Sequence, residues 1–314
     1  MITYKEFLSL IEEQVSESIE DDYTVRIVPV RKNNGVMLDS MLISRPGDMV
    51  CPNIYLNALY DCYQSGMSIP GIADRILKQY RKSMPSEAFD VEGMLNPDTV
   101  RSNVVYRVVN SSMNRELLKG VPHRDFLDLS LVYYVMVRSD QIGDGAVLVH
   151  REHQRLWGIS DEELDQAARE NTRRLLPPDI MGIDKMMGEL SEEIGINLCV
   201  KEEDNTDRGG ESGEEEFREV PMYVLTNSSR QFGACYMADK AVLNELARRE
   251  DDDLYILPSS VHECMIVPCR YEEDPEDLGK MVREINRTEV DAEEFLSDSV
   301  YHYDRIMDRV EIAA

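Results

Sequence analysis

Two serines, a histidine and a glutamate lie within five positions of one another in ILPSSVHECMIVP, residues 256–268. A serine hydrolase needs a serine nucleophile, a histidine that accepts its proton, and a carboxylate that orients the histidine. Ser259 or Ser260, together with His262, would supply the first two of these residue types. The stretch therefore raises two hypotheses, a hydrolytic site and a hairpin with a polar turn.

Strand geometry argues against a self-contained triad in this stretch. If residues 261–268 form a strand, His262 and Glu263 point to opposite faces of the sheet, whereas Ser260 and His262 could share one. Neither serine lies in the GxSxG pattern of a nucleophile elbow. In the structural interpretation, the two serines make a tight turn and their hydroxyls bond to backbone groups. We favour that interpretation.

A second polar cluster lies in VPHRDFLDLS, residues 121–130, just before an apolar strand. His123 could pair with Asp125 or Asp128 as a general base. Asp128 is also a candidate for the distant carboxylate that a hydrolase built on His262 would need. The structural interpretation is that these residues end a helix and turn the chain, where Asp and Pro are common.

The sequence predicts no metal site and no cofactor. His150 and His153 are three positions apart and match neither HExxH nor HxxEH. The six cysteines form no CxxC pair, so a structural zinc site has no support. Neither GxGxxG nor GxxxxGK[ST] occurs, which argues against the common nucleotide-binding loops.

Composition restricts the choice of partners. The 314 residues carry a net charge of −27, and 42% of them are hydrophobic, enough for a sizeable core. A surface this acidic repels phosphate backbones and anionic membranes, so we expect neither nucleic-acid binding nor membrane binding. A basic protein partner fits better. The first residues do not resemble a signal peptide and no stretch is apolar enough to span a membrane, so we expect a cytoplasmic protein.

Apolar and polar residues alternate in pairs of short segments, and each pair is followed by a segment with helical periodicity. We count four such strand–strand–helix units, which predict an α+β fold of mainly antiparallel sheets covered by helices. In the third unit the second strand is expected at residues 234–237. The last 25 residues are expected to form a short helix, a turn and a tail.

Turn-rich and acidic segments suggest where the chain divides. The predicted parts are an N-terminal unit, a middle unit, an acidic flexible loop or linker and a C-terminal pair of units, at residues 1–90, 91–200, 201–219 and 220–314.

Five stretches spread along nearly the whole chain resemble a family of bacterial proteins that carry a domain of unknown function and occur mainly in anaerobic gut clostridia. They are residues 33–66, 117–135, 222–237, 254–268 and 285–304. The resemblance implies a bacterial intracellular protein and transfers no activity, cofactor or catalytic residue.

Two functions from different classes remain. We favour a non-catalytic binding or regulatory protein, because the chain is very acidic and lacks enzyme motifs. The alternative is a hydrolase with Ser259 or Ser260 as nucleophile and His262 as base. The oligomeric state and the ligand stay open.

Overall fold

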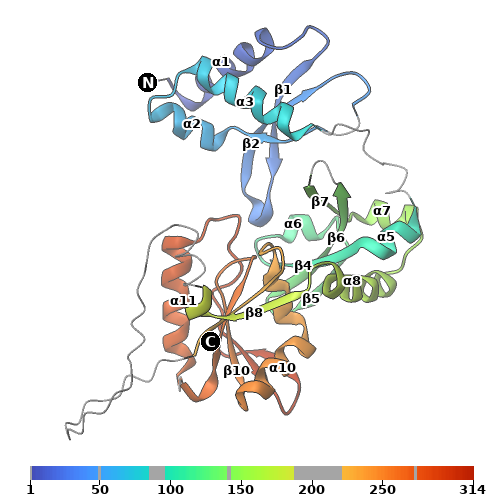
Figure 1. The fold of residues 1–314 in the computed structure, drawn as a ribbon, viewed down its shortest axis with the longest axis vertical. Helices are drawn as coiled ribbons and strands as arrows, with labels where there is room; N and C mark the ends of the chain where they lie inside the picture. Colours follow the sequence, from blue (N-terminus) through green and yellow to red (C-terminus); the bar gives the residue numbers. More distant parts are fainter. Residues whose placement is uncertain (1, 49–50, 85–95, 140–142, 187–220, 272–273) are drawn as a thin grey trace, which may run out of the picture. The chain divides into compact units, whose positions relative to one another are not determined.

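The computed structural model describes residues 2–48, 51–84, 96–139, 143–186, 221–271 and 274–314 (Figure 1). The chain divides into two compact units, one of Met1–Arg124 with Val132–Thr172 and one of Asp125–Leu131 with Arg173–Ala314. The acidic segment 201–219 lies outside the described residues. Its role, and the four-part division of the chain, stay predictions.

In the described residues, the first unit opens with three α-helices, one 3₁₀ helix and a three-stranded sheet in the order β1-β2-β3. The elements are α1 (Tyr4–Glu17), β1 (Thr24–Arg31), η1 (Asn33–Gly35), β2 (Met37–Ser44), β3 (Ile54–Tyr55), α2 (Asn57–Gln64) and α3 (Ile69–Ser83).

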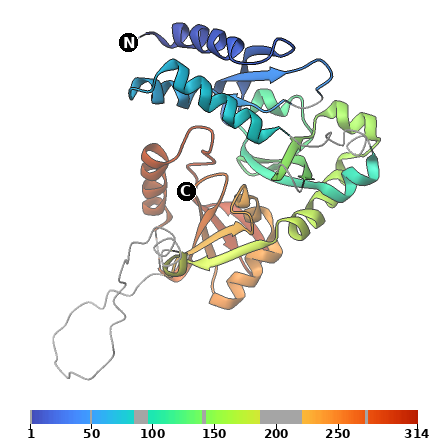
Figure 2. The ribbon, with the colours of Figure 1, turned by 45° about the horizontal axis from the view of Figure 1, so that its top comes forward.

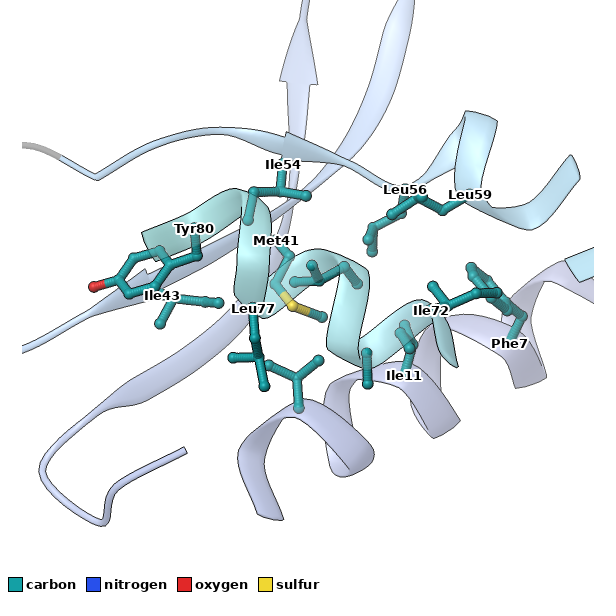
Figure 3. Close-up of a cluster of buried hydrophobic side chains, with 13 residues drawn as sticks. Phe7, Ile11, Met41, Ile43, Ile54, Leu56, Leu59, Ile72, Leu77 and Tyr80 are labelled. Atoms are coloured by element: carbon teal, nitrogen blue, oxygen red, sulfur yellow. The ribbon is translucent and has the colours of Figure 1, made fainter. Parts of the chain in front are cut away.

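Helix α1 shows how this part is built from its sequence. Thr3 and Glu6 form a capping box that satisfies the free N–H groups of the first turn. Phe7, Ile11 and Val15 recur at helical spacing and are fully buried. They belong to a core to which the sheet and helix α3 also contribute (Figure 3). The helix predicted from the periodicity of these residues is thus confirmed.

The rest of the first unit carries a four-stranded sheet in the order β4-β6-β5, with β7 paired to β6. Its elements, including the residues of β5 and β6 that belong to the second unit, are α5 (Pro97–Asn103), β4 (Val104–Asn110), α6 (Arg115–Leu118), β5 (His123–Phe126), β6 (Leu129–Ser139), β7 (Gly143–Leu148), α7 (Arg151–Trp157) and α8 (Asp161–Leu175).

The second unit is built on a six-stranded sheet in the order β13-β12-β10-β11-β9-β8. Figures 1 and 2 show helix α11 on one side of this sheet and helix α10 on the other. The elements are β8 (Pro178–Gly182), β9 (Tyr223–Asn227), η2 (Gly233–Ala238), α10 (Lys240–Glu250), β10 (Leu254–Pro258), β11 (Cys264–Pro268), η3 (Cys269–Tyr271), α11 (Pro275–Glu289), β12 (Tyr301–Asp304) and β13 (Arg309–Ile312).

Side-chain alternation along β10 and β11 explains the two covered faces. Leu257 pairs with Met265, and both belong to the hydrophobic cluster that includes Val282 of α11. Cys264 points the other way, where its sulfur lies 3.8 Å from the Ala234 carbonyl oxygen of η2. The sheet is therefore the middle layer of three.

The predicted fold class, α+β with antiparallel sheets covered by helices, is confirmed. Two expected elements are wrong. Residues 234–237 lie in the 3₁₀ helix η2, because the left-handed backbone of Phe232 turns the chain and the next six residues are wound tightly in the core. The third unit thus lacks its second strand.

The C-terminal residues form the hairpin β12–β13 and no helix. Tyr301 and Tyr303 are fully buried and alternate with the half-buried His302 and Asp304, which is the period of a strand. Among the described residues, no helix has both the length and the apolar character needed to cross a membrane.

Candidate functional site

The stretch singled out in the sequence is a five-residue connection at one end of the second unit's sheet. Pro258 and Cys264 are the last paired residues of β10 and β11, so residues 259–263 form the hairpin tip. His262 and Glu263 therefore precede the strand, and the predicted strand alternation does not decide where they point. We refer to residues 259–263 as the hairpin tip.

Both serine hydroxyls of the hairpin tip bond to its own backbone. The Ser259 hydroxyl donates to the carbonyl oxygen of Glu263 at 3.0 Å, and the Ser260 hydroxyl accepts from the backbone N–H of His262 at 3.0 Å. The Ser260 backbone N–H donates to the same Glu263 carbonyl at 3.3 Å. These bonds close the turn, as the structural interpretation of the two serines describes.

The ring of His262 is held between two other segments. Its Nδ1 accepts a hydrogen bond from the backbone N–H of Phe232 at 3.1 Å. Its Nε2 lies 3.3 Å from Oε1 of Glu294. Because Nδ1 accepts, the neutral ring carries its proton on Nε2, which donates toward the carboxylate. The one lone pair that a general base would use is therefore already occupied.

The backbone of His262 is tied to the same neighbouring loop. Its carbonyl oxygen accepts from the Gly233 N–H at 2.8 Å and from the Thr226 hydroxyl at 2.9 Å. The rings of Phe232 and His262 also lie in contact, with their centroids 5.0 Å apart. Ring and backbone together fasten the hairpin tip to residues 226–233.

Residues 226–233 have an unusual backbone, and Asn227 organises it. This fully buried side chain accepts from the N–H and the hydroxyl of Ser229 and donates to the Gln231 carbonyl. Arg230 and Phe232 have positive φ angles of 53° and 58°, which are uncommon for residues with a side chain. Such positions persist only where the surroundings hold them.

Gly233 is required by close packing in this loop. A Cβ atom at this position would lie 2.5 Å from the Thr226 hydroxyl oxygen and 2.6 Å from the Asn227 backbone nitrogen. The sequence shows a loop with Asn, Ser and Gly here, but nothing in it indicates that the loop contacts a histidine 30 positions away.

Glu263 is the carboxylate of the hairpin tip. Burial raises the pKa of its carboxyl group, and electrostatic interactions with the side chains of His262 and Arg230 oppose that effect only in part. Its carbonyl closes the turn while its side chain is half-buried. A carboxylate held in this way is less stable in its charged form than one in water.

His123 and Asp128 are placed in different surroundings. The Nδ1 of His123 lies 3.1 Å from the Val121 carbonyl oxygen, which can only accept, so this nitrogen carries the proton. Asp128 accepts from the hydroxyls of Ser297 and Tyr301 at 2.8 and 2.7 Å. The carboxylate next to His262 is that of Glu294, whereas Asp128 was the candidate for this role in the sequence analysis.

An open apolar groove lies between helix α11 and the β10–β11 hairpin. Leu257 and Met265 of the sheet lie on one side, and Met281 and Ile285 of the helix lie on the other. Met281 and Ile285 are 38% and 37% exposed, which is high for large apolar residues. Ser259 and Asn286 also line it, so the groove borders the hairpin tip.

Within the described ranges, no three His, Cys, Asp or Glu side chains are grouped so that they could hold a metal ion. The five cysteines in those ranges are free thiols. Burial raises the pKa of Cys264 and of Cys269, the latter to about 12, so neither thiol has the lowered pKa of a reactive cysteine.

The fold and these contacts define an α+β protein in which hydrogen bonds hold a polar hairpin tip in place beside an apolar groove. Residues 4–305 match the model of DUF5688, a family of unknown function, and the chain belongs to that family. No curated protein and no solved structure is similar enough to match the chain.

Proposed function

We propose that this chain is a non-catalytic binding or regulatory protein. The observation that carries the proposal is the hydrogen bond from the Phe232 backbone to Nδ1 of His262. Together with Glu294 on Nε2, it leaves the ring without a free lone pair for a serine proton. The hydroxyls of Ser259 and Ser260 are engaged with backbone groups. A binding role needs none of these groups to be free.

The hydrolase alternative can be tested directly on the folded full chain. A fluorophosphonate probe labels activated serines, and we expect no labelling of Ser259 or Ser260 above that of the heat-denatured protein. The Ser260→Ala and Ser259→Ala variants are the matched controls, since a true signal must disappear in one of them. Labelling that is lost in either variant would overturn the proposal.

The chemistry of the partner is suggested by charge. The net charge of −27 disfavours nucleic acid and anionic membranes and favours a basic protein surface. Affinity purification with the tagged full chain tests this at low and at moderate salt. We expect a basic protein to be retained at low salt, and we expect its binding to be weaker at moderate salt because salt screens the attraction. Recovery of no protein above background under both conditions would count against a binding role.

We also propose a bacterial, cytoplasmic origin for the protein. The support is the resemblance of its sequence stretches and the free state of the five described cysteines, which suits a reducing compartment. Expression of the full chain under reducing conditions should give a folded protein in which these thiols react with a maleimide after unfolding.

A further inference from the structure

The groove between helix α11 and the β10–β11 hairpin has the character of a docking surface for an apolar anchor. Met281 and Ile285 are four residues apart, so they form one ridge along the helix. Ridges of this kind receive the apolar stripe of a second helix. Methionine, here Met265 and Met281, adapts its shape to different partners better than branched side chains do.

Charge is unevenly distributed along this groove. Residues 284–298 contain six acidic residues and one basic residue. This acidic segment includes the end of α11, with the groove residues Ile285 and Asn286, and the loop that follows it. The Val261 N–H donates to the Glu294 carbonyl at 2.8 Å, which fixes the same loop beside the hairpin tip that contributes Ser259. Helix α11 and the β10–β11 hairpin, which form the two sides of the groove, thus both end beside the acidic segment 284–298.

Toward the start of α11 the charges are less one-sided, with Asp274, Glu276 and Asp277 against Lys280 and Arg283. Lys280 and Asp277 form an exposed ion pair at 2.6 Å, one turn before Ile285 and beside Met281. The groove therefore runs over apolar side chains from the less acidic start of α11 to the strongly acidic segment at its end. Its lining is almost entirely apolar, which suits one or two apolar side chains better than a polar cofactor.

We infer that this groove binds a basic amphipathic helix of another protein, with its apolar stripe on Met281 and Ile285 and its basic residues beside the acidic segment 284–298. This inference rests on the proposed binding function and names its site and its partner class. A second copy of this chain is disfavoured as the occupant, because two chains of charge −27 repel each other.

The experiment uses an 18-residue fluorescent peptide of leucine and lysine arranged with helical period, and measures its anisotropy with the full chain. Two control peptides are a scrambled sequence of the same composition and a version with glutamate in place of lysine. The Met281→Asp and Ile285→Asp variants test the groove. Leu156→Asp, which changes an apolar side chain that is 67% exposed outside the groove, is the matched control.

We expect the amphipathic basic peptide to bind, and each groove variant to weaken binding at least about tenfold. Leu156→Asp should change it less than about twofold. The direction of the change in affinity is informative. If the basic peptide were held by electrostatic attraction alone, an added aspartate would strengthen its binding. In a spectrum of ¹³C-methyl methionines, the Met281 signal should shift on binding, whereas that of the exposed Met307 should not.

Several outcomes would overturn the inference. They are no binding at about 100 μM peptide, equal binding of the glutamate peptide, and unchanged affinity in both groove variants. A dimer of the free protein that Ile285→Asp dissociates would assign the groove to self-association. Peptide binding elsewhere on the chain refutes the groove and leaves the binding function standing, whereas serine labelling by fluorophosphonate refutes the function itself.

Discussion

The backbone N–H of Phe232 donates to Nδ1 of His262, across 30 positions of sequence and a distance of 3.1 Å. Phe232 can aim this N–H at the ring because its backbone has a positive φ of 58°. The bond fixes the neutral tautomer and turns Nε2 toward Glu294. His262 thereby joins two loops, residues 226–233 and 290–295, to the hairpin tip.

Replacing His262 by alanine should destabilise the fold through this bond. The Phe232 N–H loses its acceptor, and a half-buried unsatisfied donor costs about 1–3 kcal/mol of unfolding free energy. In His262→Asn, the side-chain oxygen can accept the same bond, so much of the loss should be recovered. Urea denaturation monitored by circular dichroism measures both. Equal stability of His262→Ala and the wild type would contradict the assigned bond.

Gly233→Ala should be among the most damaging single substitutions in the second unit. The new methyl group would lie 2.6 Å from the backbone nitrogen of Asn227, which cannot move without disturbing the loop. We expect a loss of about 3 kcal/mol or more, or failure to fold. Gly182→Ala is the matched control, because no atom lies within 4 Å of the added Cβ. Thermal unfolding of the two variants should differ clearly.

Glu263→Gln should stabilise the protein at neutral pH. Burial raises the pKa of this carboxyl group in the folded state above its usual value, so the charged form is disfavoured by folding. Glutamine removes that penalty above the folded-state pKa, and the advantage should disappear as the pH falls below the unfolded-state pKa. We expect the Tm to rise by roughly 1–3 °C at pH 7.

The exposed Glu284→Gln is the control for Glu263→Gln, because it changes the net charge by the same amount. Its Tm should stay close to that of the wild type both at pH 7 and below the unfolded-state pKa of the carboxyl group. If the two glutamine variants have the same Tm at pH 7, the effect belongs to net charge and the burial of Glu263 has no part in it.

Asp165→Asn should lower stability at neutral pH in the first unit. Burial alone would raise the pKa of this carboxyl group, but the hydrogen bond and charge of Arg169, with the Tyr133 hydroxyl and Arg124, lower it. Asp165 accepts from the Arg169 Nε at 2.9 Å and from the Tyr133 hydroxyl at 3.0 Å. We expect a loss of about 1–3 kcal/mol at pH 7.

The pH dependence of the Asp165 effect follows from the lowered pKa. Its stabilisation is present above the unfolded-state pKa and is lost as the pH falls through the folded-state pKa. The difference between wild type and Asp165→Asn should therefore shrink as the pH falls below the unfolded-state pKa and through the folded-state pKa, as urea titrations at a series of pH values would show. Arg124→Ala should have a small effect, because that side chain is 54% exposed. A difference that does not change with pH would contradict the contacts assigned to Asp165.

The fold was predictable from the sequence wherever one periodicity dominated. Phe7, Ile11 and Val15 predict α1, and the predicted strands at residues 253–257 and 261–268 form the hairpin β10–β11, although the second strand begins three residues later, at Cys264. Residues 234–237 were mistaken for a strand, since short apolar runs do not distinguish a buried strand from a buried helical turn.

The contacts of the hairpin tip were only partly predictable. The turn role of Ser259 and Ser260 follows from their residue type and the adjacent proline. The partners of His262 do not follow from the sequence, because one is a backbone N–H, which every residue except proline has. The other, Glu294, is one of many carboxylates in a chain of charge −27, so its residue type carries little information.

The hydroxyls of Ser297 and Tyr301 reach Asp128 across about 170 positions of sequence, and residues 125–131 belong to the same compact unit as the C-terminal strands. On a ribosome, this unit cannot close until its last strands have emerged, although its first segment was made long before. Contacts so distant in sequence slow folding and leave apolar surface exposed meanwhile. The nascent second unit is therefore expected to need chaperone protection until strands β12 and β13 have emerged, and loss of residues 301–314 should leave it unfolded.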